Sequence, residues 1–493
     1  MDKVRVRFAP SPTGFLHIGG LRTALYNYLF AKHNNGDFIL RIEDTDRTRY
    51  VEGAIENLIQ SLKWAGIEVD EGVILNEEGK LTEKGQCGPY IQSNRLDIYK
   101  KYVDKLIESG HAYYCFCSKE RLDNLREEQR IKGQVPKYDG RCRSIPIEEA
   151  KRRIANGEEY VVRLKLPRNR FIKFHDLVRG DVTINTDEID DQVLMKSDGF
   201  PTYHMAVVVD DHLMKITHVV RGEEWLASTP KHVFLYEALG WEAPEFVHLP
   251  TVLNKNHKKL SKREGDVSVE DFKKRGYLPE GLINYLALVG WSPEDDEEIM
   301  TLKDLIPKFS FDRVVKSGGI FDVDKLNWVN SHYMKDYDLE KLCQLEKPYM
   351  IESGLMTEEE IDNNFEWFKI LVETVRDGLD KLEDLPKAVQ FLFGDLNVKE
   401  ESALEELKKD HVLQLIDQFI EELNSLEEVD DEFSRTVMKK IQKATGIKGK
   451  DLYMPVRAAI SGNVHGPELN NIILLLGKEN LLKRLNSSKK YLK

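Results

Sequence analysis

Two short segments of the chain carry residues whose types and spacing suit the binding of a nucleotide phosphate. The first, residues 11–20, reads Ser-Pro-Thr-Gly-Phe-Leu-His-Ile-Gly-Gly between a predicted strand and a predicted helix. Its glycines let a ligand approach the backbone closely, and the helix would direct unsatisfied N–H groups at an anion. His17 stands where it could donate to a phosphate that gains charge in a transition state. The same spacing is typical of a tight turn whose glycines serve packing, so both interpretations stay open here.

The second segment is a run of cations, residues 254–263, which reads Asn-Lys-Asn-His-Lys-Lys-Leu-Ser-Lys-Arg. A loop of this kind can bring Lys259, Lys262 and Arg263 onto a polyphosphate and stabilise the charge of a leaving group. Taken alone, such a run is more often a solvated basic loop, so it gains weight only beside residues 11–20.

A third group of reactive residues consists of Cys115, Cys117 and Cys142, three of the five cysteines in the chain. Three thiolates can fill three of the four tetrahedral positions that zinc prefers. A metal-free knuckle of buried thiols is the alternative. So few cysteines exclude a disulfide scaffold and indicate a reducing compartment.

The composition sets further bounds. The chain has 493 residues, with 72 Lys and Arg against 85 Asp and Glu, which gives a formal net charge of −13. This acidic balance excludes a uniformly basic nucleic-acid coat and leaves only local basic patches. The chain starts without an apolar signal segment, and its longest apolar runs, such as residues 472–476, are much too short to cross a bilayer. We therefore expect a cytoplasmic protein with no membrane partner.

Hydrophobic periodicity indicates the elements that position these residues. Residues 4–8 and 38–42 read as strands on either side of a helical repeat, which makes a parallel βαβ unit. The α/β pattern is interrupted by a stretch with strands at 161–166 and 171–174 and returns with 207–209 and 218–220, and the chain is almost wholly helical from about residue 335. The fold class predicted is α/β, with a Rossmann-like parallel-sheet domain, an inserted α+β domain, a connecting domain and an all-helical C-terminal region. The expected boundaries are 1–100 and 206–253 for the two halves of the parallel-sheet domain, 101–205 for the insertion, 254–335 for the connecting domain and 336–493 for the helical region.

The phosphate-binding segment and the cation run together resemble the signature pair of class I aminoacyl-tRNA synthetases. Four surrounding motifs and two in the closing region resemble the bacterial-type glutamyl-tRNA synthetase family within that class. In chain order these motifs are residues 7–10, 41–47, 203–206, 221–225, 455–459 and 475–479. The likeness runs in motif order from residue 4 to the end of the chain. Gly20 departs from the class motif, which ends in His, and Val207 stands where some relatives carry a polar contact to glutamate.

This resemblance implies a glutamate–tRNA ligase, which uses ATP and Mg²⁺ to form glutamyl-adenylate and then transfers the glutamyl group to the 3′ end of tRNA(Glu). The catalytic residues it implies are His17, Lys259, Lys262 and Arg263. Glutamate would be bound by Arg7, Ser11, Glu43, Tyr203 and Arg221. ATP would be bound by His17, Gly19, Glu224, Trp225 and Lys262. Relatives of this branch usually bind tRNA before they activate glutamate, and most are monomers.

The resemblance also names the domains and the tRNA contacts. The insertion would bind the acceptor end, the connecting domain would contact the stem and the helical region would bind the anticodon, with Arg47 and Arg376 as the tRNA-binding candidates. A shorter relative binds zinc through a tyrosine four residues before the last cysteine, which places Tyr138 beside Cys115, Cys117 and Cys142 as a ligand of a structural zinc. Whether tRNA(Gln) is also charged stays open, because that depends on how the last anticodon base is read.

The chemistry of the substrate agrees with the role that the resemblance gives to Arg221. Glutamate differs from glutamine by one charge, so a guanidinium held in a fixed orientation is the group that can tell them apart. The alternative for Arg221 is an internal salt bridge with Glu223 or Glu43.

Three other functions are possible for such a sequence, and one feature speaks against each. A short paralogue that glutamylates a modified tRNA base lacks the long helical region after residue 335. Glutaminyl-tRNA synthetase has a β-rich C-terminal region. A catalytically inactive RNA-binding regulator on the same fold would not need His17, Lys262 and Arg221 intact.

Overall fold

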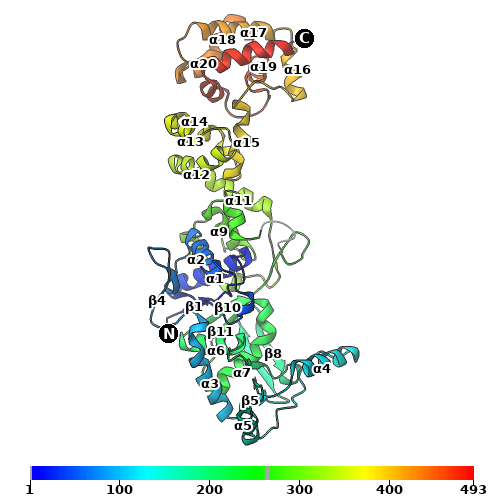
Figure 1. Cartoon of the computed structure of the whole chain (residues 1–493). Helices are drawn as coiled ribbons and strands as arrows, with labels where there is room; N and C mark the ends of the chain where they lie inside the picture. Colours follow the sequence, from blue (N-terminus) through cyan, green and yellow to red (C-terminus); the bar gives the residue numbers. More distant parts are fainter. Residues whose placement is uncertain (1–2, 261–266, 493) are drawn as a thin grey trace. The chain divides into compact units, whose positions relative to one another are not determined.

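The computed structural model describes residues 3–260 and 267–492 (Figure 1). Its Cα positions divide into two compact units, Met1–Lys274 with Leu282–Lys325, and Arg275–Gly281 with Leu326–Lys493. The first unit is mixed α/β and the second is helical, which confirms the predicted fold class.

The N-terminal sheet of the first unit begins with the predicted βαβ unit. Its strands are β1 (Arg5–Phe8), β2 (Asp37–Leu40), β3 (Glu71–Leu75) and β4 (Leu81–Lys84), in that order. The first three run parallel and β4 is antiparallel to β3. Helix α1 (Ile18–His33) joins β1 to β2, and α2 (Ala54–Trp64) precedes β3. The phosphate-binding segment therefore follows the carboxyl end of β1, where ligands bind in open α/β sheets.

A second sheet of the first unit has the strand order β10-β11-β7-β8. Its strands are β10 (His218–Gly222), β11 (Glu245–Leu249), β7 (Phe171–Asp176) and β8 (Gly180–Asn185). Helix α7 (Thr229–Leu239) connects β10 to the parallel strand β11. The backbone N–H of Thr217, just before β10, donates to the carbonyl of Arg5 in β1 at 2.9 Å, so the two sheets meet at these strands.

Three antiparallel strands form a third sheet in the predicted insertion, β5 (Ala112–Cys115), β6 (Val161–Leu164) and β9 (Val193–Met195). The helices around it are α3 (Leu96–Glu108), α4 (Lys119–Ile131), α5 (Ile147–Ala155) and α6 (Tyr203–Leu213). The expected strand at 207–209 is wrong, because these residues lie in α6. A short buried run of valines fits a buried helix as well as a strand, and here all three side chains are enclosed.

The last part of the first unit is built around a short parallel pair, β12 (Val252–Leu253) and β13 (Gly319–Ile320). Helices α8 (Val269–Lys274), α9 (Pro279–Leu288) and α10 (Leu302–Lys308) lie between these strands in the sequence. The cation run thus begins directly after β12.

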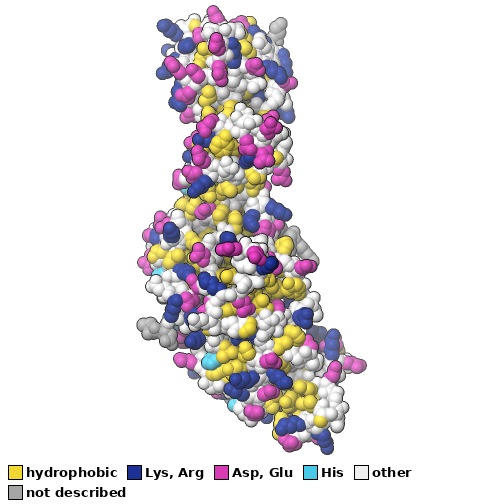
Figure 2. Space-filling view, turned by 60° about the vertical axis from the view of Figure 1, so that its left-hand side comes forward, with side chains coloured by type: hydrophobic (Ala, Val, Ile, Leu, Met, Phe, Trp, Pro, Cys, Tyr) yellow, Lys and Arg dark blue, Asp and Glu magenta, His cyan; other side chains and the backbone are white. Residues whose placement is uncertain are grey.

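The second unit is formed by helices alone among the described residues. They are α11 (Val323–Asp336), α12 (Leu339–Glu352), α13 (Glu358–Asn363), α14 (Phe365–Val375), α15 (Leu385–Val389), α16 (Glu401–Leu407), α17 (Val412–Asn424), α18 (Asp431–Thr445), α19 (Lys450–Ser461) and α20 (Leu469–Ser488). Their apolar faces share one continuous core of buried Leu, Ile, Val, Phe and Met side chains. Within the part of the chain that the structure describes, no helix is both long and apolar enough to cross a membrane. Figure 2 shows acidic and basic side chains interspersed over the face in view.

Candidate active site

A cavity of about 810 Å³ opens at the carboxyl ends of β1 and β10. The structure brings ten of the predicted site residues to its wall, from segments more than 200 residues apart in the sequence. They are Arg7, Ser11, His17, Gly19, Glu43, Tyr203, Arg221, Glu224, Trp225 and Lys259. Val207, in contrast, lies buried in α6 and is not part of the wall.

His17 caps the amino end of α1. Its Nδ1 accepts the backbone N–H of Gly19 at 3.0 Å, so in the neutral ring the proton lies on Nε2, which is a donor. A Cβ at position 20 would lie 3.1 Å from a methyl carbon of Leu16, so the side chain of Leu16 would have to shift by a few tenths of an ångström to admit one. The turn therefore places a donor side chain at a helix start, where the helix dipole favours an anion, and suits a phosphate.

A buried ion-pair network holds Arg7 and Glu43. One oxygen of Asp211 accepts both Arg7 Nε at 3.0 Å and Arg41 Nη1 at 2.7 Å, and Arg41 Nη2 donates to Glu43 at 3.0 Å. Burial raises the pKa of Glu43, although the charges of Arg41 and Arg7 oppose that shift. For Asp211, the two arginines outweigh burial and lower its pKa. The site thus presents Arg7 as an oriented cation on a rigid support.

The sequence analysis missed Asp210 and Asp211. Asp210 is fully buried and binds Arg95 at 2.7 Å, while Asp211 supports Arg7. The sequence does show that the two residues directly follow the apolar run of α6. Two adjacent carboxylates at such a position are expected to be buried and would then require cationic partners.

Arg221 lies at the end of β10 and is nearly fully buried, with its guanidinium at the cavity wall. Among the described residues no carboxylate pairs with it. The alternative for Arg221, a salt bridge with Glu223 or Glu43, is therefore not formed. Glu43 pairs with Arg41 instead, and Glu223 pairs with Arg179. Its bonds go to neutral side chains instead, so its charge is available to a ligand in the cavity.

Aromatic side chains close the cavity beside Arg221. Tyr203 lies at the start of α6. Burial raises the pKa of its phenol, so the side chain is uncharged, and its hydroxyl accepts a hydrogen bond from Arg221 at 2.9 Å. Its ring stacks on Trp225, with ring centroids 4.0 Å apart. Glu224 folds back over Gly222, where a Cβ would lie 2.2 Å from a Glu224 carboxylate oxygen. A side chain at position 222 would therefore displace the carboxylate of Glu224 from this position.

The cation run is described as far as Leu260. Lys259 is exposed and lines the cavity, and in the turn before it Nζ of Lys255 lies 3.0 Å from Asp322 and 2.6 Å from Asp324. The predicted residues Lys262 and Arg263 lie outside the described residues.

Comparison with known proteins decides the family. Residues 3–328 match tRNA synthetases class I (E and Q), catalytic domain, and residues 341–488 match an anticodon binding domain. The chain belongs to the class I tRNA synthetases for glutamate and glutamine. It is 59% identical to the glutamate–tRNA ligase of Finegoldia magna over 492 residues, and 56% identical to that of Alkaliphilus metalliredigens over 493, with at least 99% of each chain covered.

A solved structure agrees over the same length. The chain is similar to a glutamate tRNA ligase from Elizabethkingia meningosepticum in complex with its amino acid, at 37% identity and a TM-score of 0.88, with 100% of both chains covered. The similarity therefore includes both units of this synthetase and not the nucleotide-binding part alone.

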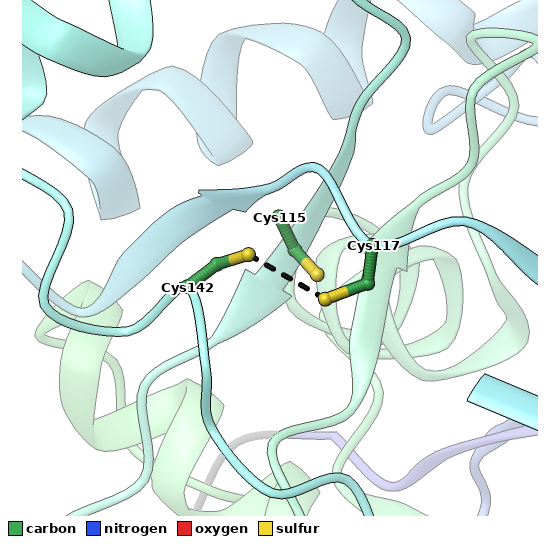
Figure 3. A group of neighbouring side chains, drawn as sticks. All are labelled: Cys115, Cys117 and Cys142. Carbon is green, nitrogen blue, oxygen red and sulfur yellow. Dashed lines mark hydrogen bonds between the residues drawn. The ribbon is translucent and has the colours of Figure 1, made fainter. Parts of the chain in front are cut away.

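The cysteines of this synthetase form a compact cluster away from the cavity. The three sulfur atoms point toward one another from the end of β5, the loop after it and the turn at Cys142 (Figure 3). They lie within 4.8 Å of one another, and Cys117 and Cys142 are 3.6 Å apart. In a zinc tetrahedron with Zn–S bonds of about 2.3 Å the sulfurs are about 3.8 Å apart, so the donor set fits.

Tyr138 completes the group as a fourth polar atom. Its hydroxyl lies 3.4 Å from the sulfur of Cys115 and 3.7 Å from that of Cys117, and it accepts the backbone N–H of Cys142 at 2.9 Å. A hydrogen bond from Cys142, which outweighs burial, lowers the pKa of Cys115 to about 4. The same hydrogen bond, with burial, raises the pKa of Cys142, so within this pair Cys115 is the favoured thiolate, the form that binds metal.

Neither of the two tRNA-binding candidates lines the cavity. Arg47 sits on the exposed turn after β2, with its guanidinium over the ring of Phe200 at 6.0 Å. Arg376 follows α14 in the helical unit, where it pairs with Glu373 at 3.1 Å and donates to the carbonyl of Tyr337 at 3.2 Å.

Proposed function

We propose that this chain is an ATP-dependent glutamate–tRNA ligase that acts on tRNA(Glu). The observation that carries the proposal is the guanidinium of Arg221, which faces the cavity without a carboxylate partner among the described residues. A buried cation in this state binds a carboxylate ligand strongly, whereas an uncharged amide would leave its charge uncompensated. The side-chain carboxylate of glutamate provides that partner.

The reaction follows from the other side chains of the cavity. Arg7, Ser11, Glu43 and Tyr203 would hold the amino acid, and Gly19, Glu224 and Trp225 the nucleotide. The α-carboxylate of glutamate attacks the α-phosphate of ATP and pyrophosphate leaves. His17 and Lys259, with Lys262 and Arg263, would stabilise the charge that develops on the phosphates. Mg²⁺, when bound, neutralises phosphate charge.

In the second step a terminal ribose hydroxyl of the tRNA attacks the carbonyl of the adenylate, and AMP leaves. Nothing in this step requires a protein nucleophile, so catalysis depends on positioning and electrostatics. We assign the acceptor end to the inserted segment 101–205 and the anticodon to the helical segment 336–493, with Arg47 and Arg376 as contacts. The enzyme would act as a monomer in the cytoplasm.

For the cysteine cluster we propose a structural zinc held by Cys115, Cys117, Cys142 and Tyr138. The sulfur separations and the hydroxyl of Tyr138 support this assignment. When bound, zinc crosslinks the end of β5 to the turn at Cys142. It takes no part in adenylation, because the cluster is not part of the cavity wall.

Aminoacylation of purified tRNA(Glu) and tRNA(Gln), side by side, tests the function. Glutamyl transfer to tRNA(Glu) is the expected result, and transfer to tRNA(Gln) as well would identify an enzyme that does not discriminate between them. Radiolabelled pyrophosphate exchange with glutamate should require tRNA. A protein that binds tRNA but gives neither exchange nor charging would overturn the proposal.

A further inference from the structure

The guanidinium of Arg221 is surrounded by neutral hydrogen-bond acceptors. Its Nε donates to Nε2 of His248 at 3.1 Å, and its Nη1 donates to the hydroxyl of Tyr203 at 2.9 Å and to Nδ1 of His232 at 3.2 Å. Its Nη2 donates to the hydroxyl of Thr229 at 2.8 Å. Arginine has five N–H groups and no acceptor, so four have protein partners and one, on Nη2, has none among the described residues.

The first of these acceptors is fixed in one tautomer. Because Arg221 can only donate, Nε2 of His248 carries the lone pair and Nδ1 carries the proton. Nδ1 lies 2.6 Å from Oδ2 of Asp176, which is the acceptor that this tautomer needs. The backbone N–H groups of His248, Val178 and Arg179 also donate to Asp176. These bonds outweigh burial and lower the pKa of Asp176, so it stays a carboxylate.

The second acceptor is fixed in the same way. Nδ1 of His232 faces Arg221 and therefore carries the lone pair, and its Nε2–H donates to Nδ1 of His204 at 2.9 Å. Burial and then the charge of Arg221 hold the pKa of His232 well below its usual range. Burial lowers that of His204 to about 4. Both rings are neutral at physiological pH.

None of these supporting side chains reaches the cavity. Arg221 and Tyr203 line its wall, whereas Asp176, His248 and His232 do not. They act on a ligand only through Arg221, so they are positioning residues. A carboxylate in their place would orient the guanidinium equally well but would neutralise it and compete with the carboxylate of the substrate.

We propose that the Asp176–His248 and His204–His232 pairs are tautomer-fixed supports that orient Arg221 while leaving its charge for the substrate, and so determine the preference for an acid over an amide. This inference rests on the proposed function, because it takes glutamate as the ligand of Arg221. Reversal of either tautomer would turn an N–H toward Arg221 and set two donors against each other.

Paired substitutions test the supports, because Gln can place an acceptor where Nε2 lies and Asn where Nδ1 lies. At position 248 the acceptor is Nε2, so His248→Gln should keep the KM for glutamate within about threefold and His248→Asn should raise it roughly 10- to 100-fold. At position 232 the acceptor is Nδ1, so the order inverts, with His232→Asn retaining function and His232→Gln losing it.

The readout is tRNA-dependent pyrophosphate exchange, measured for glutamate, glutamine and ATP. In the two impaired variants the ratio of kcat/KM for glutamate to that for glutamine should fall, while the KM for ATP stays unchanged. If the impaired variants had merely lost structure, the tolerated residue would not change from Gln at position 248 to Asn at position 232. Wild-type protein without exchange would overturn the proposed function, whereas an active wild type with equal glutamate KM in both members of each pair would overturn the supports.

A third position covers the case in which His248→Asn or His232→Gln does not fold. His204→Phe removes the acceptor of His232 without touching Arg221, and should raise the glutamate KM at least about threefold with the ATP KM unchanged. An unchanged glutamate KM in this variant also overturns the proposal.

Discussion

Nη1 of Arg41 lies 2.7 Å from Oδ1 of Asp211, and both side chains are buried. The same oxygen accepts Arg7, whose only ion pair among the described residues is this one. A fully buried pair is costly to form, but losing one partner costs more, because it leaves an uncompensated charge. Asp211 thus connects the stability of the fold to the orientation of a substrate-binding cation.

Asp211→Asn should therefore lower both stability and glutamate binding. We expect the free energy of unfolding to fall by about 3–5 kcal/mol and the glutamate KM to rise. The matched control is Glu237→Gln, which breaks the exposed pair with Arg170 and should cost less than about 1 kcal/mol. Urea unfolding and pyrophosphate exchange measure the two effects. Equal costs for the two variants would contradict the role given to Asp211.

Arg221→Gln tests the basis of substrate choice. The substitution removes the charge that the cavity offers and keeps a polar side chain, so the KM for glutamate should rise roughly 100-fold or more. The preference for glutamate over glutamine should disappear, because the neutral side chain no longer penalises an amide. Competition between the two amino acids in the exchange assay checks this, and a variant that still prefers the acid would show that another residue selects the substrate.

The cysteine cluster leads to a prediction about metal content. We expect one zinc per purified chain by elemental analysis, its loss in Cys142→Ser, and binding roughly 10- to 100-fold weaker in Tyr138→Phe. Chelation should lower the melting temperature, because the zinc crosslinks β5 to the turn at Cys142. Cys87→Ser, outside the cluster, is the control that should keep its zinc. Wild-type protein without zinc would favour the metal-free knuckle instead.

Hydrophobic periodicity in the sequence was enough to predict several strands and the helical C-terminal region. The strands at 4–8 and 171–174 and the helical C-terminal region are present, since alternation and amphipathic spacing are properties of a segment by itself. The prediction of a strand at 207–209 was wrong, because these residues are buried on all sides and their apolar pattern is then the same for a helix and a strand.

The predicted residues of the candidate site came from motifs, and their supports could not be found that way. Asp176 and His248 are 72 positions apart, and Arg41 and Asp211 are 170 apart. Such pairs are set by the way sheets and helices pack, and no spacing in the sequence marks them. The position of Arg221 was predictable, but the absence of a carboxylate beside it within the described chain required the structure.

The helical unit contains a titratable group that the mechanism does not use. Glu346 is fully buried in α12, and neither of its carboxylate oxygens has a hydrogen-bond partner among the described residues. Burial raises its pKa well above the usual range, and the charge of Asp384 adds to the shift. The folded protein therefore keeps a proton on Glu346 at pH values where the unfolded chain, with a pKa of about 4.3, has lost it.

The sign of the pH dependence follows from that difference in bound protons. The contribution of Glu346 to stability is complete below about pH 4.3 and is lost as the pH rises through the pKa of the folded state. Glu346→Gln removes this titration, so the variant should match the wild type near pH 4.5 and exceed its free energy of unfolding by on the order of 1–3 kcal/mol at pH 8. Glu352→Gln, exposed on the same helix, should change neither value. Urea unfolding across this range measures the difference, and a gap between Glu346→Gln and wild type that does not widen with pH would mean that Glu346 is already ionised in the folded protein.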